Sequence, residues 1–279
     1  MIQDQLSVVV STILDSLKDA LAPSHSEFGE CLSKFISLCQ QNINPASLYG
    51  LLSTIQLITN KFKHESKNDE LIIQILTIQS TFCSNLKDIF LFLVDLLVNP
   101  SKVGQASFPT VLYTMKICIN IIHELNFYDL IEYFEDNLQY FFEKFDIILN
   151  FDCPTMNYLK EDIYMMKIDL MTCINFFHQQ YLLDLKENKI EFFNQVYTRL
   201  LDVQFGSPTV DILYSKYFRF FNIVILDPEY KKVIGTSKII KEICDKVIMQ
   251  NVELKQNAID EFNENPGDYI NRELIKNGN

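Results

Sequence analysis

The chain has 279 residues, of which 48% are hydrophobic and 22% are charged, so it can bury a large core. It holds only 7 Gly and 8 Pro, whereas turn-rich all-β and Rossmann-type folds use more of both. The net charge of −12 argues against broad contact with nucleic acid or an anionic membrane. It favours a basic protein partner, although the same charge also keeps a large protein soluble.

Apolar residues recur at helical spacing along almost the whole chain, beginning with Ile2 to Leu21. Proline-containing breaks divide the pattern, and Ser26 is placed to cap a further helix. The expected helices therefore span residues 2–21, a segment from Ser26, 45–62, 70–98, 109–125, 128–149, 157–185, 188–204, 209–226 and 238–252.

Helix pairs begin near residues 2, 46, 109, 157 and 208, a spacing of roughly 44 to 63 residues. This is the period of HEAT-type repeats, in which stacking buries the apolar faces that a single pair leaves exposed. We therefore expect an all-α, HEAT-repeat superhelical solenoid of about five antiparallel helix pairs, with an irregular all-α globule as the alternative. The expected repeats are 1–44, 45–99, 109–150, 156–205 and 208–252, followed by an acidic tail segment, 253–279.

Motifs of catalysis and metal binding are missing from the sequence. There is no phosphate-binding Gly-rich loop, no G-x-S-x-G and no H-E-x-x-H. His123 and His178 lie on apolar helices, where a partly buried, hydrogen-bonded histidine is expected rather than a ligand or general base. The seven cysteines are scattered without a C-x-x-C pair, which indicates buried thiols in a reducing compartment. We expect no enzyme, no catalytic residue, no cofactor and no metal site.

Two acidic stretches are candidates for partner contacts. Residues 123–146 carry seven acidic residues against one Lys, and either a solvated helix face or a binding surface explains them. Within 252–275, Pro266-Gly267 interrupts the pattern among the acids, so these side chains are expected on or beside a loop, where contacts often lie. The candidate partner-binding residues are Asp260, Glu261, Glu264, Asp268 and Arg272.

Both stretches also carry a family pattern. FYDLIEYFEDNLQYFFEKFDIIL (127–149) runs from an acidic Phe-Glu-Asp-Asn motif into an aromatic-rich helix, and it resembles a segment of the CAS/exportin-2 family. IIKEICDKVIMQNVELKQNAIDEFNENPGDYINREL (239–274) resembles the same family, although its Asn-Pro-x-x-Tyr-Ile run is shared by several importin-β-like receptors. IQDQLSVVVSTI (2–13) is similar as well. Because family members are far longer, the chain resembles an internal, amino-proximal fragment.

The resemblance implies a nuclear export receptor that binds importin-α together with GTP-bound Ran and returns it to the cytoplasm. Such a protein shuttles between nucleus and cytoplasm, meets nucleoporins, and leaves the nucleotide and Mg²⁺ to Ran. It implies no direct nucleic-acid or membrane partner. A nuclear import receptor of the same superfamily and a helical scaffold without a transport role stay open as alternatives. The segment around Asp260 to Asp268 is then expected to contact a partner or to close the solenoid against another part of itself.

Overall fold

The computed structural model of the protein describes residues 45–62, 85–125, 131–181, 189–203, 207–249 and 256–277. These residues form helices and short connections, with no strand among them, whereas the helices expected before residue 45 lie outside them. Residues 85–98 are α-helical, and Pro100–Lys102 and Pro154–Leu159 form 3₁₀ turns. The other α-helices are α3 (Pro45–Phe62), α5 (Phe108–Leu125), α6 (Ile131–Glu135), α7 (Leu138–Asn150), α8 (Lys160–Tyr181), α9 (Lys189–Asp202), α10 (Pro208–Val224), α11 (Pro228–Ile234), α12 (Ser237–Ile243), α14 (Gln256–Glu264) and α15 (Pro266–Asn277).

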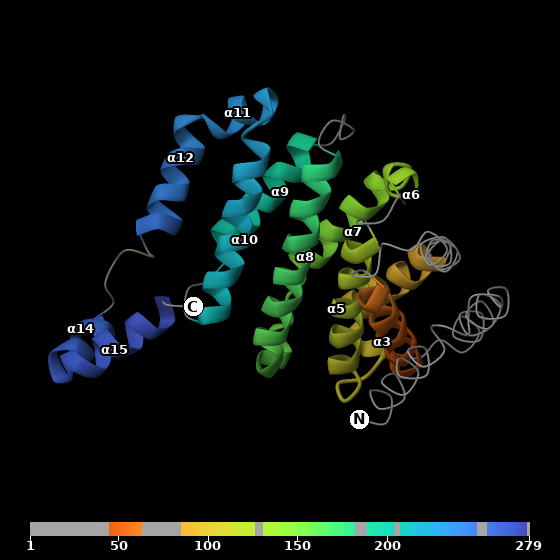
Figure 1. The fold of residues 1–279 in the computed structure, drawn as a ribbon, viewed down its shortest axis with the longest axis horizontal. Helices are drawn as coiled ribbons and strands as arrows, with labels where there is room; N and C mark the ends of the chain where they lie inside the picture. Colours follow the sequence, from red (N-terminus) through yellow and green to blue (C-terminus); the bar gives the residue numbers. More distant parts are fainter. Residues whose placement is uncertain are drawn as a thin grey trace.

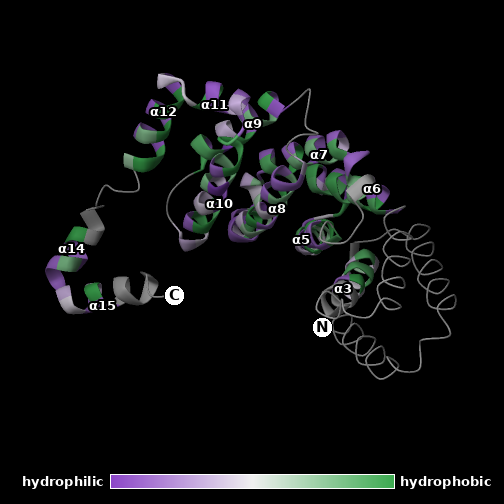
Figure 2. Ribbon diagram, turned by 45° about the horizontal axis from the view of Figure 1, so that its top comes forward, coloured by the Kyte–Doolittle hydropathy of each residue, from purple (hydrophilic) through white to green (hydrophobic). Residues whose placement is uncertain are grey.

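The long helices form two layers. α3, α5, α8 and α10 lie side by side in chain order in one layer, and α7 and α9 pack behind them (Figure 1). Figure 2 shows the chain as an arc, with α3, α5, α8 and α10 along its inner side and α7 and α9 on its outer side. This arrangement is a HEAT-type solenoid, as the repeat period predicts. The exact repeat boundaries stay a prediction.

Proline and its preceding residue set where several helices begin. Proline suits a first helical position because the missing N–H would have no partner there. At α11, Asp227 completes the start, since its Oδ1 accepts a hydrogen bond from the backbone N–H of Glu229 at 2.7 Å. Proline is the first residue of four of the described α-helices, at Pro45, Pro208, Pro228 and Pro266.

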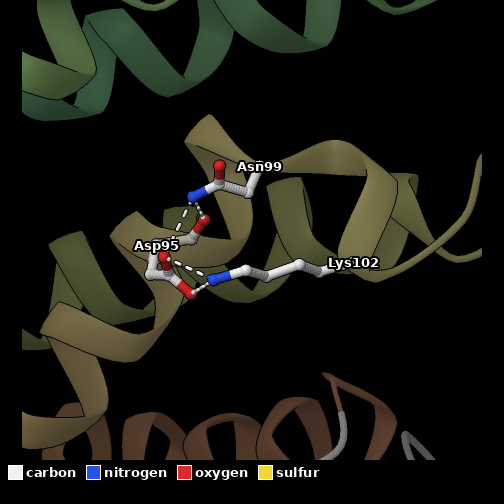
Figure 3. A network of polar contacts seen from close by, with 3 residues as sticks. All are labelled: Asp95, Asn99 and Lys102. Carbon is white, nitrogen blue, oxygen red and sulfur yellow. Dashed lines mark hydrogen bonds and ion pairs between the residues drawn. The ribbon is translucent and has the colours of Figure 1, made fainter.

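The connection after the helix of residues 85–98 is tied back to that helix. The Asn99 side-chain amide donates to the Asp95 backbone carbonyl at 3.0 Å and to Asp95 Oδ1 at 2.9 Å (Figure 3). Lys102 Nζ reaches the same carboxylate at 2.7 Å. Gly104 then adopts φ +77°, which favours glycine because it has no Cβ. The predicted break at 99–109 is confirmed, and these contacts hold it in one conformation.

The predicted continuous helix over 128–149 is wrong. The structure divides the described part of it into α6 and α7, with a turn at Asp136 and Asn137 between them. The Asn137 side chain donates to the Tyr133 carbonyl at 2.6 Å, so it competes with the backbone for a helical acceptor. Asn and Asp have low helix propensity for this reason.

Aromatic side chains connect the two layers from one helix pair to the next. Phe90 contacts Phe141, with ring centroids 5.9 Å apart, and Phe134 meets Phe177 edge-on at 5.5 Å. The ring contacts continue through α9 and α10 and reach Tyr230 on α11, 5.8 Å from Phe193. Such pairs stabilise a core beyond the area they bury. Phe and Tyr side chains therefore pack the described helices against one another.

Candidate partner-binding surfaces

The acidic candidates lie on two short helices at the end of the chain, α14 and α15, which pack against each other. Only Asn265 separates them outside helical conformation, so the predicted interruption is present and the acids lie on the two helices beside it rather than on a long loop. The Asn265 side chain stabilises the start of α15, so a single non-helical residue is enough to separate the two helices. Its Oδ1 accepts from the backbone N–H of Asp268 at 3.4 Å, and its amide donates to the Asp268 carboxylate at 2.5 Å.

The structure places the five predicted residues on both helices of this hairpin. Asp260, Glu261 and Glu264 are exposed on α14, and Asp268 is exposed in the first turn of α15. A carboxylate in the first turn is favoured by the helix dipole. Arg272 belongs to α15, and its side chain lies outside what the structure describes. The four acids therefore form one exposed acidic surface, the α14–α15 hairpin surface.

Apolar side chains lie beside these acids, and sequence reasoning missed them. Ile259 is 36% exposed, Phe262 is 43% exposed and Ile270 is 48% exposed. Phe262 meets Tyr269 edge-on at 5.6 Å, which holds the two helices together. The three-residue spacing of Ile259 and Phe262 is a helical signal that was present in the sequence. A surface that combines exposed acids and apolar groups is suited to a partner with basic and apolar groups.

The described histidines do not form a catalytic constellation. His178 is fully buried, and its Nδ1–H donates to the Ile174 carbonyl at 3.1 Å. Burial lowers the pKa of His178 to about 4, so the ring is neutral at pH 7. His123 is half-buried on α5, edge-on to Phe176 at 5.3 Å and 3.9 Å from the Glu124 carboxylate. His178 is hydrogen-bonded as predicted, but it is fully rather than partly buried.

The described cysteines are single thiols. Cys118, Cys153 and Cys173 are buried and Cys244 is partly buried, each without a disulfide. Burial raises the pKa of Cys118 and Cys173 well above the ordinary thiol value, so both stay protonated. Within the described residues, no cluster of His, Cys, Asp or Glu could hold a metal ion, and no helix has the length and apolarity to cross a membrane.

The fold and its exposed surfaces define an α-solenoid of the HEAT class, built from stacked helix pairs. A family model described as Cse1 matches residues 58–277, most of the chain. The chain belongs to the Cse1 family.

The similar proteins are exportins. Exportin-2 of Xenopus laevis is 26% identical over 229 residues, which is 81% of this chain and 23% of that protein. Human Exportin-2 is 26% identical over 230 residues, with the same coverage of each chain. A solved structure described as the exportin Cse1 in its cargo-free, cytoplasmic state superposes with a TM-score of 0.74 at 22% identity, over 97% of this chain and 29% of that one. The chain thus spans about a quarter of the length of these relatives, and the solved structure supports its fold.

Proposed function

We propose that the protein acts as a nuclear transport receptor of the export type. The observation that carries this proposal is the continuous similarity to Exportin-2 over 81% of the chain. The stacked-pair architecture supports it, since a solenoid presents a long, curved surface to folded protein partners. Motion between nucleus and cytoplasm is part of the same proposal.

The proposed partners are importin-α and GTP-bound Ran, bound together. The acidic α14–α15 hairpin surface and the net charge of −12 suit basic patches on either partner. Small rotations between neighbouring repeats offer a physical route by which one partner changes the affinity for the other. Nucleoporins are further proposed contacts during passage.

Binding with and without Ran tests the proposal. The protein is immobilised, and importin-α is titrated alone, with Ran-GTP and with Ran-GDP. An export receptor binds importin-α at least tenfold more tightly with Ran-GTP than with Ran-GDP, the size of a typical allosteric coupling. An import receptor instead loses its cargo when Ran-GTP is added. A helical scaffold without a transport role binds Ran in neither nucleotide state, and either of these last two results would contradict the proposal.

A further inference from the structure

A pocket lined mainly by polar and charged residues lies on the inner layer, where α5, α8 and α10 meet. It has a volume of about 390 Å³. α8 is central to it, since it packs against both α5 and α10 (Figure 1). Its lining includes His123 from α5, Thr172, Asn175 and Phe176 from α8, and Lys216 and Arg219 from α10.

The charge of this pocket is opposite to that of the chain. Lys216 and Arg219 are three residues apart on α10, so they share one face of that helix. Both line the pocket, and His123 lines it from the opposite side, whereas no acidic residue belongs to the lining. Asp169 and Glu124 lie outside the lining, but the Asp169 carboxylate interacts electrostatically with Lys216 and His123, and burial raises its pKa. In a chain with net charge −12, such a site favours an anionic group.

Asn175 sets a second requirement for a ligand of this pocket. It is 2% exposed and lies in the pocket wall, and its side-chain amide donates to the Lys216 carbonyl at 3.0 Å. That bond fixes the other end of the amide as the acceptor. Among the described residues, Asn175 Oδ1 has no hydrogen-bond partner. A buried acceptor without a partner is costly, so a ligand that brings an N–H donor is favoured here.

The ligand therefore needs an anion and a neighbouring N–H group. Inorganic phosphate satisfies Lys216 and Arg219, but it is chiefly an acceptor and offers little to Asn175 Oδ1. An Asp or Glu residue within a peptide brings both groups a few bonds apart. The Phe176 ring supplies apolar contact for the stem of such a side chain.

We propose that the pocket between α5, α8 and α10 binds an acidic residue on an extended segment of a protein partner. The carboxylate lies between Lys216 and Arg219 on one side and His123 on the other. A peptide N–H meets Asn175. This site is distinct from the acidic α14–α15 hairpin surface and takes the opposite charge, so it does not depend on importin-α or Ran being the partner.

Short capped peptides test this site in the whole chain. Acetyl-Gly-Asp-Glu-Asp-Gly-amide, its neutral Asn/Gln/Asn counterpart and inorganic phosphate are titrated at equal ionic strength. The readouts are calorimetry and the NMR signals of His123 and Phe176. The acidic peptide is expected to bind saturably and to shift both signals, whereas phosphate binds at least tenfold more weakly and the neutral peptide does not saturate.

Two double variants test whether the acidic peptide binds in this pocket. Lys216→Gln with Arg219→Gln is expected to weaken the acidic peptide at least tenfold, because two charge-assisted contacts are lost. Lys231→Gln with Lys232→Gln removes the same charge from exposed positions on α11 and should change affinity less than twofold. Melting temperatures confirm that both variants fold. Equal losses in the two variants, phosphate binding as tight as the peptide, or no saturable binding would each overturn the proposal.

Discussion

His178 shows how one polar residue fits an aromatic core. Its ring lies edge-on to Phe142 at 5.1 Å and to Phe220 at 4.8 Å, and it stacks on Phe192 at 5.6 Å. The hydrogen bond to Ile174 satisfies one ring nitrogen, whereas Nε2 has no partner among the described residues. A charged ring is therefore strongly disfavoured at this position.

The buried imidazole makes stability depend on pH. In the unfolded chain this histidine takes up its proton near its ordinary pKa of 6.5, but in the folded chain only near pH 4. Between these values the unfolded state binds more protons, so acidification favours unfolding, by about 3 kcal/mol across the window. Denaturant unfolding at pH 7, 6, 5 and 4 should show a shallower decline in His178→Leu than in the parent protein. Parallel curves for the two proteins would contradict this.

Substitution of Phe142 is expected to be among the most destabilising changes to the core. The Phe142 ring is 6% exposed and meets Phe192 at 4.6 Å, at the junction of α7 with α9. Phe142→Ala leaves a cavity there, and we expect it to reduce the free energy of unfolding by about 3–5 kcal/mol. Phe262→Ala is the matched control, because that ring is 43% exposed on α14, and its cost should stay below about 1 kcal/mol. Equal losses in urea unfolding would place Phe142 outside the core.

Burial of single residues could be predicted only where it follows a helical stripe. Phe134 and Phe142 lie at helical spacing among other apolar residues, and both are buried. Asn175 gives no comparable signal, because its burial depends on α10 lying beside α8. Its contact with Lys216 joins residues 41 positions apart, and no local pattern encodes it.

At the scale of the element, the Asn265 side chain caps the first turn of α15. Asn265→Ala removes the cap and should cost α15 about 1 kcal/mol, seen as faster amide exchange over residues 267–270. Asn271→Ala is the control, because alanine in a helix interior has higher propensity and should slow the same exchange slightly. Unchanged exchange in Asn265→Ala would show that packing against α14 alone sets the start of the helix.

The α14–α15 hairpin surface is expected to act on association rate. Neutralising Asp260, Glu261, Glu264 and Asp268 to amides should slow association with a basic partner by about tenfold at low salt and flatten its salt dependence. Stopped-flow mixing with importin-α and Ran-GTP measures both. A control that neutralises four exposed acids elsewhere, Glu135, Asp136, Glu143 and Glu161, should have a smaller effect.

The two variants also distinguish the hairpin surface from exposed acids elsewhere on the chain. If the control slows association as much as the hairpin variant, total charge rather than position governs the encounter. If neither variant changes the rate or its salt dependence, the hairpin surface has no role in attracting the partner.

Element boundaries could be predicted where proline marks them and not where asparagine does. The start of α10 follows from Pro208, whose effect on the backbone is local, whereas Pro228 marked only a break and the helix α11 that begins there was not expected. Asn137 divides α6 from α7 through a side-chain hydrogen bond to Tyr133, which depends on the conformation that the chain has already adopted. For the same reason, the hydrogen bond between the Asn265 side chain and Asp268 at the start of α15 could not be predicted from the sequence.

At the scale of the molecule, the period of the helix pairs was sufficient to predict a solenoid. Curvature was not predictable, because it accumulates from small rotations between neighbouring repeats that leave no sequence signal. The pocket at His123, Asn175 and Lys216 was out of reach for the same reason, since three helices far apart in sequence form it. The family pattern at 127–149 and 239–274 supplied what periodicity could not, the family to which the chain belongs.

We propose that the inner side of the arc binds folded protein partners. Hydrogen exchange of the chain, alone and with importin-α plus Ran-GTP, tests it most directly. We expect slower exchange in the inner helices α5, α8 and α10 and in α14 and α15, with the outer helices α7 and α9 unchanged (Figure 2). Protection confined to α7 and α9, or no protection at all with both partners present, would contradict the claim.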